Sequence, residues 1–559
     1  MTVTCPVVPA YSSRGWPTGG RSTALWTRGP ELSPELLALL VSAMFALFYN
    51  DAFWRSVITA QHPVTLQIIG YGMILVAAQF LLMLLLLGNF YARAFIALWI
   101  LVAAGVSYFT DNYGIYFDVD MVDNILQTDR REAGDLLTWH MAEHFLLYGL
   151  LPCFALYRIR IPRLRWQASL RRRAIWIVAS IVILAVALVP SFQGFSTLMR
   201  NEKALRFLIT PANYMVATTR VLAASDPGPA VRLPVGEDVS TIAHTGDRPL
   251  LMVIVVGETV RAANWGLNGY SRQTTPLLAQ TDAINFQNVS SCGTSTAVSL
   301  PCMFSAAGRA DYDKRYASGH ESLLDVLQRA GMSVLWLDNQ SGCKGVCDGV
   351  ENRKVAALDY PELCPDGECL DGVLLEELVR QLGVPGSGVR QDTVVVLHQM
   401  GNHGPGYYKR YPDSLHRFRP TCDADDLTLC TREQIVNSYD NAVLATDALL
   451  AGVIGYLERQ SDYVPAMLYV SDHGESLGEM GIYLHGLPYF VAPDEQTRVP
   501  MVWWSRADFD SAVALDKSCL RDVAAQPLSH DNIFSSVLAM LGLHSQVIDP
   551  DLDITGNCG

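Results

Sequence analysis

Three polar residues beyond position 250 have the types and spacing that metal-assisted chemistry needs. Glu258 follows an apolar run, and Asp472 and His473 together follow another. Two carboxylates and an imidazole form a donor set that suits Zn²⁺. Each residue alone has a plainer interpretation, because Glu258 could cap a helix and Asp-His-Gly sequences are common in turns. Delivered together from the ends of different strands, they predict a metal site.

A hydroxyl-rich segment between two cysteines offers the candidate nucleophile. This segment, Cys292 to Cys302, reads CGTSTAVSLPC. A Ser or Thr hydroxyl attacks poorly until a metal or a base lowers its pKa. The same residues could cap a helix. The two roles are compatible, because a helix N-terminus suits a group that will carry a phosphate.

The elements that must position these residues form an alternating pattern. Apolar, β-branched runs predict buried strands at 249–256, 333–337, 393–397, 466–470 and 499–504. Helical stretches lie between them at 323–330, 374–382, 433–457 and 532–541. The pattern predicts an α/β domain with a mostly parallel sheet sandwiched by helices. Ligands of such sheets bind beyond the carboxyl ends of the strands, where His403 and His485 also fall.

The first third of the chain has the composition of a membrane anchor. The whole chain is 50% hydrophobic and only 17% charged, against about 25% charged in soluble proteins. A bilayer span needs about 20 apolar residues. Five segments qualify, at 36–54, 64–87, 93–110, 137–157 and 174–191. Buried core helices are the alternative, but five closely spaced runs favour transmembrane helices.

Arginine placement predicts the orientation of the anchor. The loop from Arg158 to Arg173 holds seven Arg and no acid, which predicts a cytoplasmic side. The tail 1–34 carries three Arg and no signal-peptide core, and it fits the same side. An odd number of spans then places everything after residue 191 outside. We expect a tail (1–34), a five-helix domain (35–191), a linker (192–247) and an exported catalytic domain (248–559).

Charge separates the two halves further. Residues 1–190 carry a net charge of +3 and the remainder −17. An acidic catalytic half argues against nucleic acid as a partner. The outer loop from Asp111 to Leu136 is also acidic, and Glu143 begins the fourth span with His140 and His144 beside it. Ionisable groups at this depth are functional candidates, although Glu143 could also be a carboxylate that reaches headgroup water.

Cysteine usage agrees with export. Ten of the 12 Cys lie beyond residue 290. A paired, even set in an exported domain predicts disulfides. Zinc knuckles are the alternative, but the absence of nearby His partners favours disulfides. The close pairs are Cys292/Cys302, Cys343/Cys347, Cys364/Cys369 and Cys422/Cys430, with Cys519/Cys558 as a possible fifth and Cys5 and Cys153 expected as free thiols.

Several motifs together resemble those of one enzyme family. They are Gly257-Glu258-Thr259, Asn268-Gly269-Tyr270, the Cys-Gly-Thr-Ser-Thr segment, Asp338 to Gly345, His403-Gly404-Pro405 and Ser471 to Glu479. This combination is similar to the phosphoethanolamine transferases, and more narrowly to the lipid A phosphoethanolamine transferases, which include mobile colistin-resistance enzymes. The resemblance runs from about residue 35 to 545. It implies an alkaline phosphatase/sulfatase-like catalytic fold.

The resemblance also implies roles for individual residues. Thr296 would be the nucleophile, and Glu258, Thr296, Asp472 and His473 would bind one zinc ion. Lys344, His403 and His485 would contact the phosphate or ethanolamine, or hold a second zinc. Gln340 stands where some relatives have Asn and would keep a hydrogen-bonding role. A short motif in the outer loop, with Asn124 and Gln127, and the end of span four, with Glu143, would face the donor headgroup.

The implied reaction moves phosphoethanolamine from phosphatidylethanolamine to a phosphate of lipid A through a phospho-threonine intermediate. The enzyme would act as a monomer in the bacterial inner membrane, with its catalytic domain in the periplasm and His403 or His485 as proton carrier. Rival acceptors are core oligosaccharide or a glucan. Sulfatase activity is disfavoured, because Ser299-Leu300-Pro301-Cys302-Met303 lacks the Arg of the sulfatase motif. A glycerophosphate transferase remains an alternative, whereas a non-enzymatic sensor would be expected to lack a ligand.

Overall fold

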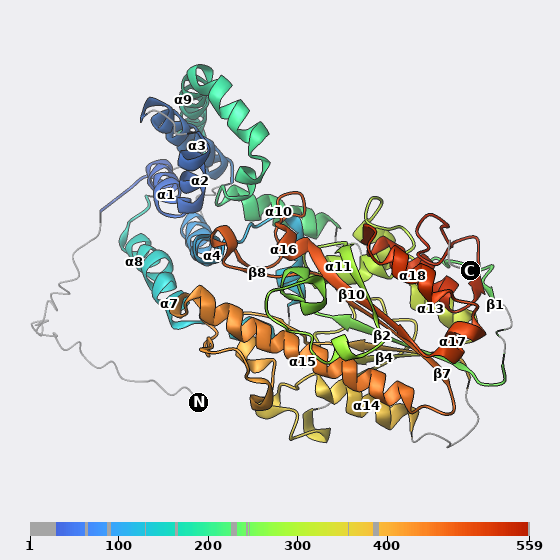
Figure 1. Cartoon of the computed structure of the whole chain (residues 1–559). Coiled ribbons are helices and arrows are strands. Elements are labelled where there is room, and N and C mark those ends of the chain that lie inside the picture. The colour runs from blue at the N-terminus through green and yellow to red at the C-terminus, as the bar shows by residue number, and fades with distance from the viewer. Residues whose placement is uncertain are drawn as a thin grey trace, which may run out of the picture.

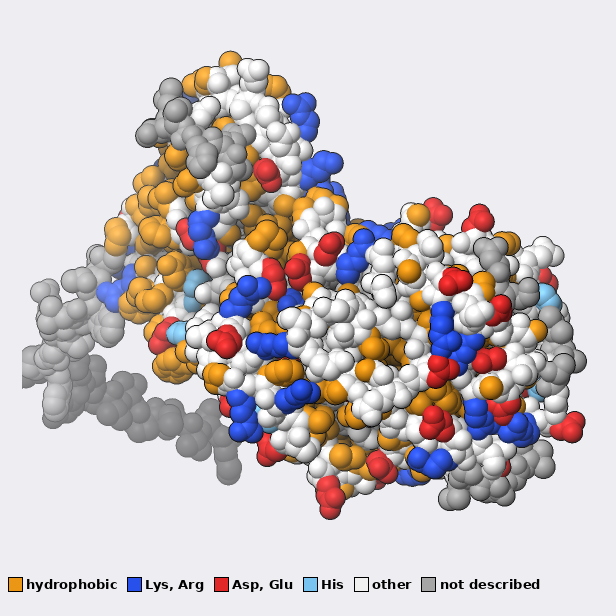
Figure 2. All heavy atoms as spheres, viewed as in Figure 1, with side chains coloured by type: hydrophobic (Ala, Val, Ile, Leu, Met, Phe, Trp, Pro, Cys, Tyr) orange, Lys and Arg blue, Asp and Glu red, His pale blue; other side chains and the backbone are white. Residues whose placement is uncertain are grey.

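The computed structural model describes residues 30–61, 65–86, 91–128, 130–162, 166–224, 232–241, 244, 246–355, 357–383 and 391–556. A bundle of N-terminal helices stands beside a larger α/β body (Figure 1). Hydrophobic side chains gather on the visible face of the bundle, whereas charged side chains are spread over the α/β body (Figure 2). The two surfaces suit a membrane and water respectively.

The α/β body is built on an eight-stranded sheet of order β11-β3-β10-β7-β2-β6-β4-β5. Its strands are β2 (Leu250–Gly257), β3 (Ile284–Ser290), β4 (Ser333–Asp338), β5 (Glu351–Lys354), β6 (Thr393–His398), β7 (Val464–Ser471), β10 (Arg498–Ser505) and β11 (Leu528–Ser529). Strand β10 pairs antiparallel with both β3 and β7, and the other pairings are parallel. The mostly parallel sheet is therefore confirmed, and all five predicted strands are present.

Helices cover both faces of the sheet, and strand β2 shows how. Its alternate side chains enter two different cores, with Val253 facing helices α14 (Gly372–Leu382) and α15 (Arg432–Glu458). Ile254 faces the other way, toward α13 (Leu323–Arg329) and α19 (Asp531–Met540). A strand buried on both faces explains its continuous apolar sequence. The remaining helices of this body are α11 (Thr296–Met303), α12 (Lys314–Gly319), α16 (Asp494–Thr497), α17 (Ala507–Ala512) and α18 (Lys517–Val523), and its short strand pairs are β1 (Ser240–Thr241) with β12 (Leu543–His544) and β8 (Ser476–Leu477) with β9 (Tyr483–Leu484).

The helical bundle contains the predicted apolar segments. Its helices are α1 (Pro34–Phe48), α2 (Asp51–Gln61), α3 (Thr65–Leu86), α4 (Ala92–Tyr113), α7 (Trp139–His144), α8 (Leu151–Arg158) and α9 (Trp166–Asn201). Helices α1 and α2 meet at a 55° bend and are apolar enough for one span together. A π-helical turn, η1 (Phe145–Leu150), joins α7 to α8, so 139–158 forms one helical run. Predicted segments two, three and four thus agree with the structure to within a few residues, whereas segment one is divided by the bend and segment five extends further at both ends.

Length and apolarity alone also select α15 as a span among the described helices. However, 72% of its apolar window is buried inside the protein, against 11% for α9 and about half for α3 and α4. Helix α15 covers the sheet of the α/β body (Figure 1). The membrane-facing helices are therefore those of the N-terminal bundle.

The segment expected as a linker is largely helical. Helix α9 continues through Pro190 to Asn201, ten residues past its predicted end, and is followed by η2 (Lys203–Phe207) and α10 (Ala212–Ala224). Asn50, in the break between α1 and α2, donates to the Thr210 carbonyl and accepts from the Thr210 amide. Gln79 donates to the same carbonyl. These amides fix the start of the bridging segment against the bundle.

Candidate active site

The predicted metal ligands meet at the carboxyl edge of the sheet. Glu258 follows β2, and Asp472 and His473 follow the neighbouring strand β7, where Gly257 lies opposite Ser471. The Nε2 atom of His473 lies 3.4 Å from Glu258 Oε1 and 3.4 Å from Asp472 Oδ2. All three side chains are fully buried. Adjacent parallel strands therefore bring together residues more than 200 positions apart.

The hydroxyl of Thr296 completes this cluster. Thr296 is the first residue of α11, after Ser295 in extended conformation. Its Oγ1 donates to Glu258 Oε2 at 3.0 Å and lies 3.3 Å from His473 Nε2. Thr294 and Ser295 are also buried, but Thr294 donates to the Leu487 carbonyl. Of these three neighbouring hydroxyl residues, Thr296 is the one that reaches the cluster.

The cluster has the electrostatics of a cation site. The Nδ1 atom of His473 lies 2.9 Å from the Gly474 carbonyl, so its N–H points there and Nε2 faces the carboxylates. Burial disfavours a charged imidazole, but Asp472 and Glu258 outweigh it and raise the pKa of His473 to about 10. Burial together with the Glu258 charge raises the pKa of Asp472 to about 6. Burial opposes ionisation of Glu258, yet His473 holds the pKa of that carboxyl below its ordinary value. Positive charge at this point is strongly favoured.

Two carboxylate oxygens in the cluster have no hydrogen-bond donor within the described part of the chain. They are Glu258 Oε1 and Asp472 Oδ2, the two carboxylate oxygens that lie 3.4 Å from His473 Nε2. A buried carboxylate oxygen without a donor is costly unless it is paired or binds a metal. The imidazole nitrogen, the carboxylates and the Thr296 hydroxyl are donors that fit a divalent cation such as Zn²⁺.

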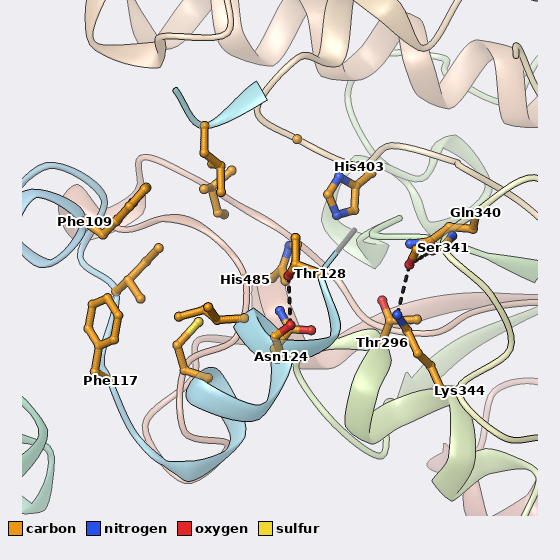
Figure 3. A pocket seen from close by; sticks show the side chains of 16 residues that line it. Phe109, Phe117, Asn124, Thr128, Thr296, Gln340, Ser341, Lys344, His403 and His485 are labelled. Carbon is orange, nitrogen blue, oxygen red and sulfur yellow. Dashed lines mark hydrogen bonds between the residues drawn. The ribbon is translucent and has the colours of Figure 1, made fainter. Parts of the chain in front are cut away.

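Thr296 lies at one end of a cavity of about 120 Å³ that opens to solvent. Gln340, Ser341 and Lys344 line the same end, whereas Phe109 and Phe117 line the opposite end (Figure 3). Further apolar lining comes from Ile115, Met121, Ile125, Leu136 and Leu484. The cavity thus joins a polar, reactive end to an apolar end that borders the membrane helix α4 and the outer loop.

Gln340, Ser341 and Lys344 form a chain of contacts at the polar end. The Gln340 amide donates to Glu258 Oε2 at 3.1 Å. The Ser341 hydroxyl donates to the Gln340 carbonyl oxygen, and Lys344 Nζ donates to the Ser341 hydroxyl at 3.0 Å. The amide predicted at Gln340 therefore reaches the cluster itself, and Lys344 supplies a cation at the same end of the cavity as Thr296.

The two predicted histidines line the cavity next to His473. The His485 ring lies 4.5 Å from the His473 ring and 5.5 Å from the His403 ring. Its Nδ1 is 2.9 Å from Glu475 Oε2, and Glu475 also accepts the Tyr407 hydroxyl at 2.9 Å. Burial lowers the pKa of His403 to about 3. Glu475 and Tyr407 were not singled out from sequence, although Glu475 lies within the Ser471–Glu479 motif.

The loop between α4 and α7 forms one wall of the cavity through helix α5 (Val119–Gln127). Asn124 lines the cavity as expected (Figure 3). Thr128, which was not singled out, also lines it and donates to the Asn124 carbonyl. Gln127 and Glu143 do not line it: Gln127 donates to Asp123, and Glu143 is exposed on α7. The short loop motif did not predict which residues of α5 would face the cavity.

The acidic residues of this loop contact cations of the α/β body. Asp123 pairs with Lys314 at 2.5 Å. Asp135, in α6 (Arg130–Asp135), pairs with Lys409 at 2.7 Å and with Arg410 at 3.5 Å. His140 lies 2.8 Å from Asp426. Asp123 and Asp135 therefore dock the loop on the α/β body.

Four disulfides join the close cysteine pairs: Cys292–Cys302, Cys343–Cys347, Cys364–Cys369 and Cys422–Cys430. The first encloses the Thr296 helix start, and the second encloses Lys344. Cys153 is a free thiol, as predicted. Cys5 and Cys558 lie outside the described residues, so their predicted states are not tested.

Comparisons with known proteins match both parts of the chain. The family "Phosphoethanolamine transferase EptA/EptB" matches residues 75–225, and the family "Sulfatase" matches residues 251–543. The chain is 39% identical to Phosphoethanolamine transferase EptA of Escherichia coli K12, covering 94% of this chain and 97% of that protein. It is 37% identical to Phosphatidylethanolamine transferase Mcr-1 of Escherichia coli, covering 86% and 91%.

A solved structure has the same architecture over almost the whole length. The integral membrane lipooligosaccharide phosphoethanolamine transferase A (EptA) of Neisseria meningitidis superposes with a TM-score of 0.90 at 38% identity. The match covers 95% of this chain and 99% of that one. Membrane helices joined to a sulfatase-like catalytic domain, with the cluster at Thr296 in its sheet edge, make this chain a member of the EptA/EptB phosphoethanolamine transferase family.

Proposed function

We propose that this protein transfers phosphoethanolamine from phosphatidylethanolamine to a phosphate of lipid A. The observation that carries the proposal is the placement of the Thr296 hydroxyl. It lies 3.0 Å from Glu258 and 3.3 Å from His473, at the polar end of a cavity whose other end is apolar. A phospholipid has the same division into a phosphate headgroup and an apolar tail.

The ligands of the proposed zinc ion are Glu258, Asp472, His473 and Thr296. The two carboxylate oxygens without donors and the Nε2 of His473 support this choice. When bound there, zinc would stabilise charge on phosphate oxygens and favour the ionised threonine hydroxyl. His403 and His485 line the same cavity and offer nitrogen donors should a second ion bind.

In the first half of the reaction, the Thr296 oxygen attacks the donor phosphorus and the bond to the glycerol oxygen breaks. Glu258 Oε2 accepts a hydrogen bond from the Thr296 hydroxyl and is placed to receive its proton. Lys344 and Gln340, both on the cavity wall, are placed to hold the phosphate oxygens. His485 is anchored to Glu475 through Nδ1, which leaves Nε2 to carry a proton to the departing glycerol oxygen.

In the second half, an oxygen of the acceptor phosphate attacks the phosphorus on Thr296, and the threonine oxygen leaves and regains a proton. One nucleophile that serves both halves predicts ping-pong kinetics. Diacylglycerol and phosphoethanolamine-modified lipid A are the two products. Both substrates are amphiphiles, which explains why the catalytic body is joined to a membrane bundle.

The membrane arrangement that we propose has five spans: α1 with α2, α3, α4, the run from α7 to α8, and α9. Their apolar sequences and the Arg-rich Arg158–Arg173 loop support this count and a cytoplasmic N-terminus. The catalytic domain, residues 248–559, then lies in the periplasm of a bacterial inner membrane. We propose that a single chain is active, because the described site is formed by residues of one chain.

One relative has a name that suggests a different acceptor from the one proposed here. The chain is 26% identical to Kdo(2)-lipid A phosphoethanolamine 7''-transferase of Escherichia coli K12, whose name gives Kdo(2)-lipid A as the acceptor and 7'' as the position. The identity to Phosphoethanolamine transferase EptA of the same organism is higher, 39%, and that name gives no acceptor. Mass spectrometry of lipid A from cells with and without this chain decides between the two acceptors.

We expect the mass of lipid A to rise by one phosphoethanolamine group when the chain is present. Mild acid hydrolysis separates lipid A from the core sugars before the measurement. If lipid A is unchanged and the added mass is on the core fragment, the acceptor is a core sugar and not a lipid A phosphate. If neither fragment gains mass, the proposal is overturned. The Thr296→Ala chain, expressed to the same level, is the matched control.

A further inference from the structure

We propose that His530 is a positioning residue that holds the nucleophile segment in register with the metal-ligand strand. This inference rests on the proposed role of Thr296. His530 lies between the edge strand β11 and helix α19, outside the motifs that identify the family. It is fully buried, and its side chain does not line the cavity.

Both ring nitrogens of His530 contact backbone groups beside the site. The Nε2 atom lies 3.0 Å from the carbonyl oxygen of Ser471, the residue before Asp472. The Nδ1 atom lies 3.1 Å from the amide nitrogen of Cys292, four residues before Thr296. The imidazole therefore bridges the end of β7 and the start of the segment that carries the nucleophile.

These contacts require one form of the ring. A carbonyl oxygen can only accept, so Nε2 carries the proton and donates to Ser471. A backbone amide can only donate, so Nδ1 must be an unprotonated acceptor for Cys292. Burial lowers the pKa of His530 to about 3, which agrees with a neutral ring. Every hydrogen-bonding group of the imidazole is thereby used in holding the two segments together.

Ser299 adds a second connection on the same side. It lies one helical turn after Ser295 in α11, and its hydroxyl donates to the carbonyl oxygen of Asp472. The same hydroxyl oxygen is 3.3 Å from His530 Nδ1. The peptide between Ser471 and Asp472 is thus tied to both the entry and the first turn of the nucleophile helix.

This arrangement controls the distance that the reaction depends on. Thr296 must stay near Glu258 and His473. However, the strand before Thr296, β3, does not pair directly with β7, the strand before His473. Strand β10 separates β7 from β3, which leads into the nucleophile segment. His530 spans this gap at the edge of the sheet. A displacement of about 1 Å in a reacting group can cost 10²-fold in rate.

The test uses the full-length chain in mixed micelles with fluorescent phosphatidylethanolamine as the probe. Rapid quenching measures the rate at which label reaches Thr296. His530→Ala should slow this step about 10²-fold, with the KM for the donor and the zinc content per chain unchanged. His530→Asn keeps an acceptor near the Nδ1 position, and His530→Gln keeps a donor near Nε2. Each should recover part of the rate.

Ser299→Ala supplies the double-mutant cycle. If the two side chains hold the same register, the combined variant should lose less than the product of the two single losses. The control is Asp447→Asn, which disturbs a buried carboxylate that accepts from the amides of Leu277 and Leu278, away from the cavity. It should lower the melting temperature and leave the rate of labelling unchanged.

The outcomes separate the two proposals. Loss of labelling in Thr296→Ala together with wild-type rates in all His530 variants overturns the positioning role alone. Full activity in Thr296→Ala overturns the proposed function and, with it, the inference that rests on Thr296. A rate loss in His530→Ala that only matches its loss of zinc or of folded protein would make the residue structural and would also overturn the inference.

Discussion

The carboxyl edge of the sheet and the outer loop between α4 and α7 both border the cavity, but they differ in how directly sequence specifies them. At the sheet edge, Glu258, Asp472 and His473 come together as predicted. In the outer loop, Asn124 faces the cavity while Gln127 and Glu143 do not. A strand end has one direction and one neighbour on each side, so its following residue has a defined place. A loop helix can present any face.

The two regions also use charge differently. Carboxylates at the sheet edge are fully buried around His473. Carboxylates of the loop, such as Asp123 and Asp135, bind Lys and Arg of the catalytic body. The same residue type therefore forms a candidate metal site in one region and a docking contact in the other. We expect substitutions at the edge to affect the rate of chemistry and those in the loop to affect donor binding.

The largest effect should come from removing the nucleophile. Thr296→Ala should lower transfer on the order of 10³-fold or more, because it removes the attacking oxygen. The protein should remain folded, since the side chain is small. Thr296→Ser is the matched variant and should keep measurable activity, because it retains a hydroxyl. Mass mapping of the trapped phosphoethanolamine adduct to any other residue would contradict this assignment.

Loss of a proposed metal ligand should have the next largest effect. Asp472→Asn and Glu258→Gln should each lower activity at least about 10²-fold, since even indirect changes to ligand orientation cost 10–100-fold. Added zinc should rescue Asp472→Asn better, because Glu258 also accepts a hydrogen bond from the Thr296 hydroxyl. Zinc per chain, measured by mass spectrometry, reports binding directly. Full zinc content in both inactive variants would argue against their role as ligands.

Particular elements show what sequence could and could not predict. Strands such as β2 and β7 were recognisable because both faces are buried and their sequences are continuously apolar. Strand β3 was missed because Ile284–Ser290 alternates buried and partly exposed residues. The site ligands were predictable because strand ends place them. The cavity was not, because its walls come from α4, α5 and three distant loops.

A third prediction sharpens the contrast within the outer loop. Asn124→Ala should raise the KM for phosphatidylethanolamine about tenfold, the equivalent of one good hydrogen bond, while kcat changes little. Gln127→Ala and Glu143→Gln are matched controls on the same loop and its following helix, and both should leave KM within about twofold. A larger effect from Glu143→Gln than from Asn124→Ala would show that the donor approaches along a different surface.

The smallest expected effect concerns the pH response of the same loop. Asp118 caps α5 by accepting from the Met121 amide at 2.9 Å. Burial, reinforced by the charge of Asp120, raises its pKa to about 7 from an ordinary value of 3.8, although the bond to Met121 opposes the shift. Because the folded pKa is raised, the stabilising contribution is complete below about pH 4 and is lost as pH rises through 7.

The amides of helix α5 should therefore become less protected from hydrogen exchange as the pH rises from 6 to 8.5. The expected loss over this interval is about 1–2 kcal/mol, since each pH unit between the unfolded and the folded pKa costs up to about 1.4 kcal/mol for one group, and the loss levels off above the folded pKa. Hydrogen exchange of the α5 amides, corrected for the intrinsic pH dependence, measures it. Asp118→Asn keeps a capping oxygen without a charge, so its α5 should show the same protection at both pH values.

The sheet edge provides the internal reference, because β2 is fully buried and should remain protected in both proteins. A wild-type α5 that is equally protected at both pH values would mean that the loop contacts, such as Asp135 with Lys409, determine its stability and that the cap contributes little.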